Sequence, residues 1–172
     1  MATELKNLSE YDSTALPDMS EKRVAIVVSE WNEKITSGLL EGAKATLLAA
    51  NCKEDNILIN FVPGTFELPL AATWALNLKN VNGVIALGSV IRGETAHFDF
   101  VCQAASQGIK DVGLEFNKPV IFGVLTDDTL QQAIDRSGGK HGNKGTEAAV
   151  ACMKMIALEE KFSGRNGIGF KN

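Results

Sequence analysis

The sequence predicts an α/β domain of three layers, in which a doubly wound, parallel, four-stranded sheet is covered by helices on both faces. Four short apolar runs alternate along the chain with longer stretches whose apolar residues recur at helical spacing. The runs are continuously apolar, as in strands that a parallel sheet buries on both faces. Right-handed crossovers join such strands, so that their carboxyl ends share one edge of the sheet.

Length and charge restrict the class of protein. The chain has 172 residues, 45% of them hydrophobic, and no change of composition divides it, so a single core is expected. The net charge of -4, with scattered lysines and arginines, offers no basic surface for nucleic acid. No apolar stretch approaches the ~20 residues of a membrane span, and no secretion signal is recognisable, so we expect a cytoplasmic protein without a membrane partner.

The sequence offers no recognisable metal site or nucleotide-binding motif. Cys52, Cys102 and Cys152 lack CxxC spacing, and two of them continue apolar helical patterns, as buried thiols do. His97 and His141 are the only histidines, which is too few nitrogen ligands for a zinc cluster. The P-loop and Gly-x-Gly-x-x-Gly motifs are absent, which disfavours ordinary nucleotide chemistry.

The first strand and helix follow a polar segment. Residues 1–21 are mostly polar, which predicts a flexible arm that could dock on a neighbour. Residues 23–29 are a β-branched run and are expected to form the central strand. A helical pattern then continues until Asn51. The folded domain is expected over residues 22–163, followed by a polar tail over residues 164–172.

Two further strands lead toward the chemically distinctive part of the chain. The second strand, residues 57–62, is stopped by Pro63, and Pro69 is expected to interrupt the next helix early. The third strand ends in the apolar run of residues 84–87. A turn framed by glycines then separates this strand from a helix that starts after Thr95.

The last strand and two helices complete the domain. The fourth strand, residues 120–125, leads into a short helix that Asp128 or Thr129 can cap. Residues 137–145 form a glycine-rich turn before a long final helix. Helical periodicity predicts that one side of this final helix faces the core. That side contains Ala148, Ala151, Met155 and Leu158.

The shared edge of the predicted sheet collects candidate ligand-binding residues. Trp31 follows the first strand, and its ring either packs in the core or stacks on a planar ligand, with equal support for both. The third strand brings Ser89 and Arg92 to the same edge. The turn at residues 93–95 precedes a helix N-terminus, whose free N–H groups attract anions. This turn is therefore a candidate phosphate-binding site, called the phosphate seat below.

Four more residues have both a structural and a functional interpretation. Glu67 either complements the positive end of a helix dipole or binds a ligand. Arg136 and Lys144 are either solvated charges or ligand contacts, and their closeness to glycine turns favours the second interpretation. His97 follows the candidate phosphate seat and either caps a helix or transfers protons near neutral pH.

Five segments of the chain together carry a recognisable pattern. They are Trp31-Asn32, Val62-Pro-Gly-Thr-Phe-Glu-Leu-Pro69, Leu87-Gly-Ser-Val-Ile-Arg-Gly-Glu-Thr-Ala-His97, Val120-Ile-Phe-Gly123 and Gly142-Asn-Lys-Gly145. In this order they resemble the 6,7-dimethyl-8-ribityllumazine synthase family, and the resemblance extends over about residues 24–162. It implies a flavodoxin-like sheet and the condensation of 5-amino-6-(D-ribitylamino)uracil with 3,4-dihydroxy-2-butanone 4-phosphate. It implies no cofactor and no metal.

The resemblance also implies roles for individual residues. Trp31 would stack on the pyrimidine, and His97 would move protons during imine formation and phosphate loss. Phe122 would reach a site in the adjacent subunit. The remaining residues implied to line the pyrimidine and ribityl pocket are Thr65, Phe66, Glu67, Ser89, Val90, Ile91 and Lys144. Those implied to hold the phosphate of the second substrate are Glu94, Thr95 and Arg136.

Two positions depart from the family pattern. Trp31 stands where many members have phenylalanine, which keeps a stacking face but changes the size of the pocket. Glu94 puts a carboxylate beside the expected phosphate, so its backbone N–H is expected to make the contact while its side chain turns away.

The resemblance further implies a homo-oligomer. A site that borrows Phe122 from a neighbour cannot be complete in a monomer, so we expect a ring of five subunits as the minimum active unit. The compact turn at residues 137–145 favours twelve such pentamers in a shell, with riboflavin synthase as a candidate partner. Two alternatives stay open: a related riboflavin synthase, which would not need a phosphate seat, and a flavin- or lumazine-binding shell protein without turnover.

Overall fold

The computed structural model describes residues 16–164 of the chain. One four-stranded parallel sheet has the strand order β2-β1-β3-β4, which confirms the predicted sheet. Its strands are β1 (Val24–Ser29), β2 (Ile57–Val62), β3 (Gly83–Ile91) and β4 (Val120–Asp127). Most of the predicted arm, residues 1–15, and the predicted tail from residue 165 onward lie outside the described residues.

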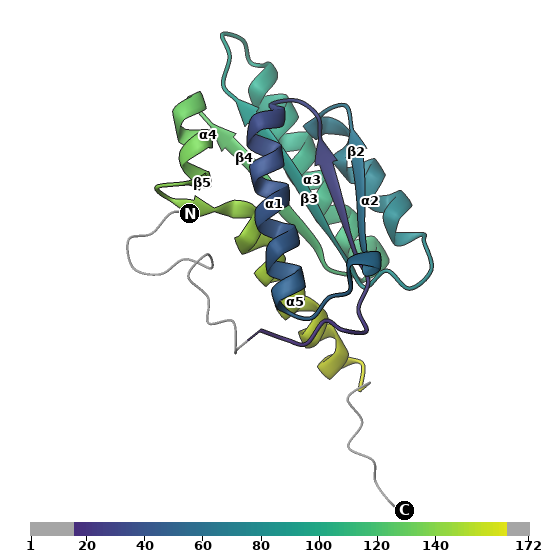
Figure 1. Ribbon diagram of the computed structural model, residues 1–172. Coiled ribbons are helices and arrows are strands. Elements are labelled where there is room, and N and C mark those ends of the chain that lie inside the picture. The colour runs from purple at the N-terminus through teal and green to yellow at the C-terminus, as the bar shows by residue number, and fades with distance from the viewer. Residues whose placement is uncertain (1–15, 165–172) are drawn as a thin grey trace, which may run out of the picture.

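Helices cover both faces of this sheet (Figure 1). On one face, Ile26 and Ile85 belong to a core cluster that includes Leu39 and Met153. The opposite face packs on the helices that follow β2 and β3. The first face carries α1 (Glu33–Ala49), α4 (Leu130–Arg136) and α5 (Lys144–Phe162), and the second carries α2 (Leu68–Leu76) and α3 (His97–Phe116). The short 3-10 helices are η2 (Glu54–Asn56) and η3 (Thr65–Glu67).

The third strand is longer than the apolar run predicted. β3 continues past Leu87 because β4 pairs with it as far as Ile91, opposite Asp127. The sequence suggested a turn at Gly88, but this glycine lies inside the strand. A Cβ at Gly88 would lie 2.7 Å from Oγ1 of Thr65, so close packing explains the glycine there.

Three local features refine the predicted helices and turns. Pro69 does not interrupt α2 but lies in its first turn, where the missing N–H has no intrahelical partner to lose. Thr129 caps α4, since its hydroxyl accepts a hydrogen bond from the backbone N–H of Gln132 at 3.2 Å. The glycine-rich turn forms a small hairpin of β5 (Ser137–Gly139) and β6 (Gly142–Asn143).

The core-facing side of α5 was predicted wrongly in part. Met155 and Leu158 are 46% and 42% exposed, and the helix instead buries Ala149, Cys152, Met153 and Ile156. Both sides of this helix are apolar, so periodicity alone could not choose between them. The choice is made by the close approach of α1 and α5, where a Cβ at Gly145 would lie 1.8 Å from the backbone oxygen of Leu39.

Met19 is 1% exposed and its N–H donates to the oxygen of Ala50 at 2.8 Å, so the packed chain begins before residue 22.

Burial raises the pKa of the Cys152 thiol to about 12. Within residues 16–164, no three metal-binding side chains converge on one point. No helix in that range has the length and hydropathy of a membrane span.

Candidate active site

A pocket of about 560 Å³ opens where the carboxyl ends of β1 and β3 meet the N-terminus of α3. The helices that follow these neighbouring strands cover opposite faces of the sheet, and such a switch point leaves a crevice in doubly wound folds. The pocket is lined by Trp31, Asn32, Gly64, Thr65, Phe66, Glu67, Ser89, Val90, Ile91, His97 and Val101. Residues predicted from four separate parts of the chain therefore share one cavity.

Trp31 presents an exposed ring on a fixed backbone. The residue is 73% exposed, which excludes the core-packing interpretation. Its N–H donates to the oxygen of Pro63 at 3.4 Å. The next residue, Asn32, has left-handed backbone angles (φ 59, ψ 44), and its side chain Nδ2 donates to the oxygen of Ser89 at 2.9 Å. Asn32 thus ties the end of β1 to β3 next to Trp31, a role that we did not predict, although asparagine tolerates this conformation well.

The segment η3 forms a second wall of the pocket. Thr65 is 5% exposed and anchors the segment over β3, whereas Phe66 is 60% exposed. A Cβ at Gly64 would lie 3.0 Å from Oε2 of Glu67 and 3.4 Å from Cδ1 of Trp31, so the glycine leaves room for both. The Glu67 carboxylate makes no capping bond at α2 and accepts no hydrogen bond from residues 16–164. It is therefore available to accept hydrogen bonds from ligand hydroxyls.

The end of β3 supplies a buried hydroxyl to the pocket. Ser89 is 2% exposed, and its Oγ has no hydrogen-bond partner among the described residues. A buried polar group without a partner costs about 1–3 kcal/mol, so such groups are uncommon in folded proteins. Ser89 can recover this cost by bonding a ligand, while Val90 and Ile91 beside it offer half-buried apolar contact.

His97 is the first residue of α3 and is exposed in the pocket. Its backbone N–H donates to Oγ1 of Thr95 at 3.4 Å, so the hydroxyl of Thr95, and not the imidazole, serves the helix terminus. The imidazole has no ion pair or hydrogen bond within residues 16–164. Glu94 and Thr95 are exposed, and a Cβ at Gly93 would meet no atom within 4 Å, so the turn is open to an approaching ligand.

Arg92, the other arginine predicted at this edge of the sheet, is held by side chains of its own chain. Its Nε donates to Oδ1 of Asp128 at 2.9 Å, and Nη1 donates to Oδ1 of Asp99 at 3.2 Å. The guanidinium also lies 4.1 Å from the ring centroid of Phe98. The hydrogen bond to Asp128 is the main factor that raises the pKa of Arg92. Arg92 therefore ties the β3–α3 turn to the β4–α4 turn.

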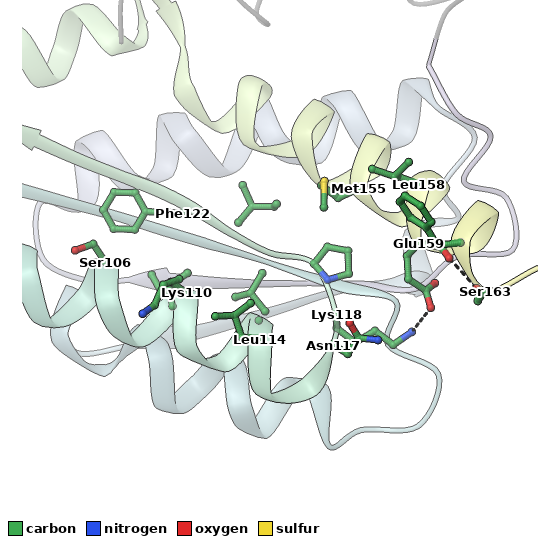
Figure 2. Close-up of a pocket in the computed structure, with 16 residues that line it drawn as sticks. Ser106, Lys110, Leu114, Asn117, Lys118, Phe122, Met155, Leu158, Glu159 and Ser163 are labelled. Carbon is green, nitrogen blue, oxygen red and sulfur yellow. Dashed lines mark hydrogen bonds and ion pairs between the residues drawn. The ribbon is translucent and has the colours of Figure 1, made fainter.

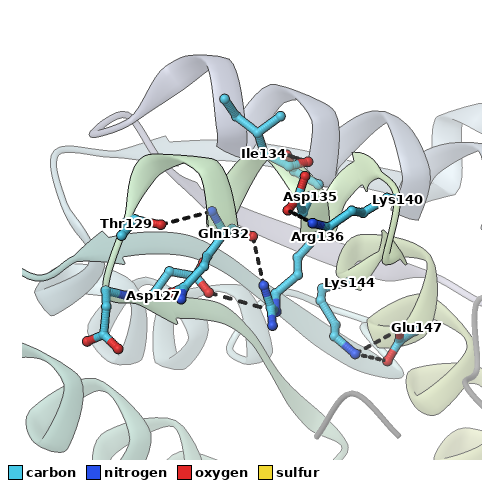
Figure 3. A network of polar contacts seen from close by, with 11 residues as sticks. Asp127, Thr129, Gln132, Ile134, Asp135, Arg136, Lys140, Lys144 and Glu147 are labelled. Atoms are coloured by element: carbon cyan, nitrogen blue, oxygen red, sulfur yellow. Dashed lines mark hydrogen bonds and ion pairs between the residues drawn. The ribbon is translucent and has the colours of Figure 1, made fainter. Parts of the chain in front are cut away.

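Arg136 and Lys144 do not line the pocket of their own chain. Both are half-buried beside the carboxyl end of β4, and Figure 3 shows their contacts. Nη1 of Arg136 donates to the oxygen of Gln132 at 3.1 Å, and its Nε lies 3.9 Å from Oδ1 of Asp127. Nζ of Lys144 contacts the Glu147 carboxylate at 2.7 and 2.8 Å. Neither cation is a simple solvated charge.

Phe122 also lies outside the pocket, on β4 at the edge of the sheet. It is 40% exposed and lines a groove of about 640 Å³ between α3 and α5 (Figure 2). The exposed side chains of Leu114, Met155 and Leu158 line the same groove. The predicted site residues thus lie in three places in one chain. Most line the pocket, Glu94 and Thr95 lie in the turn just before His97 without lining it, and Phe122, Arg136 and Lys144 lie near β4.

Comparison with known proteins identifies the family. The model of the 6,7-dimethyl-8-ribityllumazine synthase family matches residues 21–160. The 6,7-dimethyl-8-ribityllumazine synthase of Cytophaga hutchinsonii is 56% identical to the chain, over 91% of this chain and 98% of that protein. The synthase of Flavobacterium johnsoniae is 53% identical, over 95% of this chain and 86% of that protein. The chain therefore belongs to the 6,7-dimethyl-8-ribityllumazine synthase family.

Proposed function

We propose that the pocket at the β1–β3 switch point condenses 5-amino-6-(D-ribitylamino)uracil with 3,4-dihydroxy-2-butanone 4-phosphate. The chain is a transferase of riboflavin biosynthesis, as its family membership establishes. The observation that carries the proposal is the convergence on one cavity of an exposed indole with a carboxylate and an imidazole that have no partner within residues 16–164. These belong to Trp31, Glu67 and His97. Both relatives named above are 6,7-dimethyl-8-ribityllumazine synthases, so neither alternative function gains support.

The pyrimidine substrate suits the wall formed by Trp31 and η3. A planar heterocycle can stack on the exposed indole, and such stacking stabilises a complex by about 1–3 kcal/mol. The ribityl hydroxyls would donate to the Glu67 carboxylate and bond the buried hydroxyl of Ser89, which has no partner in the described part of the chain. A volume of about 560 Å³ is within the range of small-molecule pockets.

His97 is proposed to transfer protons between the two substrates. When the pyrimidine amine attacks the ketone, a proton must reach the oxygen that leaves as water. Loss of phosphate then requires a proton to be taken from carbon. An imidazole performs both tasks near neutral pH, and no enzyme nucleophile is needed because the attacking amine belongs to a substrate.

The phosphate is proposed to bind between two subunits of a homo-oligomer. The turn at Glu94 and Thr95 would offer backbone N–H groups, and Arg136 and Lys144 of the adjacent subunit would offer positive charge. The position of both cations beside β4, outside the pocket of their own chain, supports this arrangement. The groove beside β4 combines exposed Phe122 with exposed apolar side chains of the flanking helices, and this supports a subunit contact there.

We further propose a cytoplasmic ring of five subunits, assembled as twelve rings in a shell that could enclose riboflavin synthase. Head-to-tail contacts that share sites close into rings, and the short hairpin of β5 and β6 supports further packing of rings because it adds few residues between the last two helices. Sedimentation at micromolar concentration should show a species of five or sixty subunits. A monodisperse monomer with full activity would overturn the shared site.

Mixing two impaired variants tests the shared site directly. The His97→Ala variant lacks the imidazole but keeps Arg136, and the Arg136→Ala variant lacks the guanidinium but keeps His97. If each site takes the two residues from different subunits, equal random mixing restores about one quarter of the sites, because each residue is intact with a probability of about one half. If both residues act within one chain, co-expression recovers no activity beyond the sum of the two variants.

A further inference from the structure

We infer that Asp127 is a positioning residue for Arg136, holding its guanidinium so that the free N–H groups face the phosphate of the butanone substrate. Asp127 lies in none of the segments that identified the family and lines no part of the pocket. The inference rests on the proposed function, in which Arg136 binds that phosphate.

Asp127 is held rigidly at the end of the sheet. It is the last residue of β4 and pairs with Ile91 of β3. Its backbone oxygen accepts a hydrogen bond from the N–H of Arg92 at 2.9 Å. The residue is 6% exposed, so its carboxylate has little freedom to turn toward water. A charge fixed in this way can define the position of a neighbouring cation.

The fold itself gives no reason for a carboxylate at this position. Oδ2 of Asp127 is buried without a hydrogen-bond partner in the described part of the chain. The helix that follows is capped by Thr129, so Asp127 does not serve that role. Burial is the main factor that raises the pKa of Asp127, and the nearby Arg136 opposes it. Arg136 is the cation that partly compensates this buried charge.

The guanidinium of Arg136 is approached from two sides. Oδ1 of Asp127 lies 3.9 Å from Nε, and the backbone oxygen of Gln132 accepts a hydrogen bond from Nη1 at 3.1 Å. Gln132 is itself fixed, because its side chain accepts a hydrogen bond from the N–H of Asp128 at 2.9 Å. Nη2 of Arg136 has no acceptor within residues 16–164. A planar guanidinium oriented in this way keeps a fork for phosphate oxygens.

The adjacent carboxylate provides a matched control. Asp128 bonds Nε of Arg92 and makes no contact with Arg136, so each acid of the pair serves a different arginine. Asp127→Asn and Asp128→Asn remove the same charge at neighbouring positions. A general electrostatic effect on an anion would be similar in both variants, whereas a positioning effect through Arg136 belongs to Asp127 alone.

The test uses the full-length, assembled protein and two phosphate readouts. These are the KM for the butanone phosphate and the inhibition constant of inorganic phosphate. We expect Asp127→Asn to raise both by about 5- to 10-fold, or about 1–1.4 kcal/mol. The KM for the pyrimidine should stay within about twofold. Asp128→Asn keeps an amide oxygen for the hydrogen bond from Nε of Arg92, so it should raise both phosphate readouts by less than Asp127→Asn does. In an Arg136→Ala background the effect of Asp127→Asn should disappear, because the group that it positions is gone.

Several outcomes would overturn the inference. Unchanged or tighter phosphate binding in Asp127→Asn would mean that the Asp127 carboxylate does not position Arg136 and at most repels the phosphate. An effect that persists without Arg136 would mean that Asp127 acts by another route. If Arg136→Ala leaves phosphate binding intact and Arg92→Ala weakens it, the proposed function of Arg136 fails, and the inference with it. The same double-mutant comparison with Arg136→Ala can be repeated with Asp127→Ser. Circular dichroism of each variant then distinguishes a loss of phosphate binding from a folding defect.

Discussion

Removing the indole of Trp31 should weaken pyrimidine binding without destabilising the fold. The side chain is 73% exposed, so Trp31→Ala should change the free energy of unfolding by less than about 0.5 kcal/mol. Loss of stacking should cost about 1–3 kcal/mol of binding free energy. This corresponds to a rise of about 5- to 150-fold in the Kd of the pyrimidine. Trp31→Phe keeps a stacking face and should lose much less.

The chain allows this contact to be observed directly. Trp31 and Trp74 are its two tryptophans, and Trp74 is 62% exposed on α2, outside the pocket. Trp74→Phe therefore leaves Trp31 as the single indole, and Trp31→Phe leaves Trp74. Titration with the pyrimidine substrate should quench the fluorescence of the first variant and leave that of the second unchanged. Equal Kd values for Trp31→Ala and the parent protein, or quenching confined to Trp74, would refute the stacking role.

Three further predictions follow from the same geometry. His97→Ala should lower kcat by about 10²–10⁴ while the Kd of the pyrimidine stays within about twofold. His141→Ala, outside the pocket, should leave kcat and KM unchanged. A normal kcat in His97→Ala would remove His97 from the mechanism. Gly145→Ala should destabilise the protein in denaturant titrations by about 1–3 kcal/mol, because a Cβ there would lie 1.8 Å from an α1 backbone oxygen. Gly93→Ala, with no atom within 4 Å, should be neutral for stability, and equal losses would contradict the packing argument. The raised pKa of Asp127 means that its ionised form costs stability above that pKa, and the cost disappears as pH falls below the ordinary value of 3.8. Asp127→Asn should therefore raise the Tm most near pH 7, with a difference that shrinks toward pH 4; a constant difference would contradict it.

Periodicity and strand ends were sufficient to predict the sheet and the edge at which the pocket lies. Continuous apolar runs identify strands buried on both faces, and parallel strands bring their carboxyl ends to one edge. Trp31, Thr65 and Ser89 follow or end different strands, so their meeting in one cavity follows from the topology. His97 joins them because the helix that follows β3 starts at the same edge.

Three residues have environments that depend on tertiary packing and could not be predicted from the sequence. Gly88 looks like a turn residue, yet it lies inside β3 because β4 pairs with the strand there, and Thr65 packs so closely that only glycine fits. α5 has apolar residues on both sides, so Met155 had the same periodic signal as a core residue although it is exposed. Asp127 lies in a run of polar residues typical of a helix cap. Only the structure shows that it is buried beside Arg136.

The most direct test of the proposed function is to incubate the full-length protein with both substrates and follow lumazine absorbance and phosphate release together. A lumazine synthase should form one phosphate for each lumazine, with no product when either substrate is omitted. Absence of lumazine when both substrates are bound, or formation of riboflavin from lumazine alone, would contradict the proposed reaction.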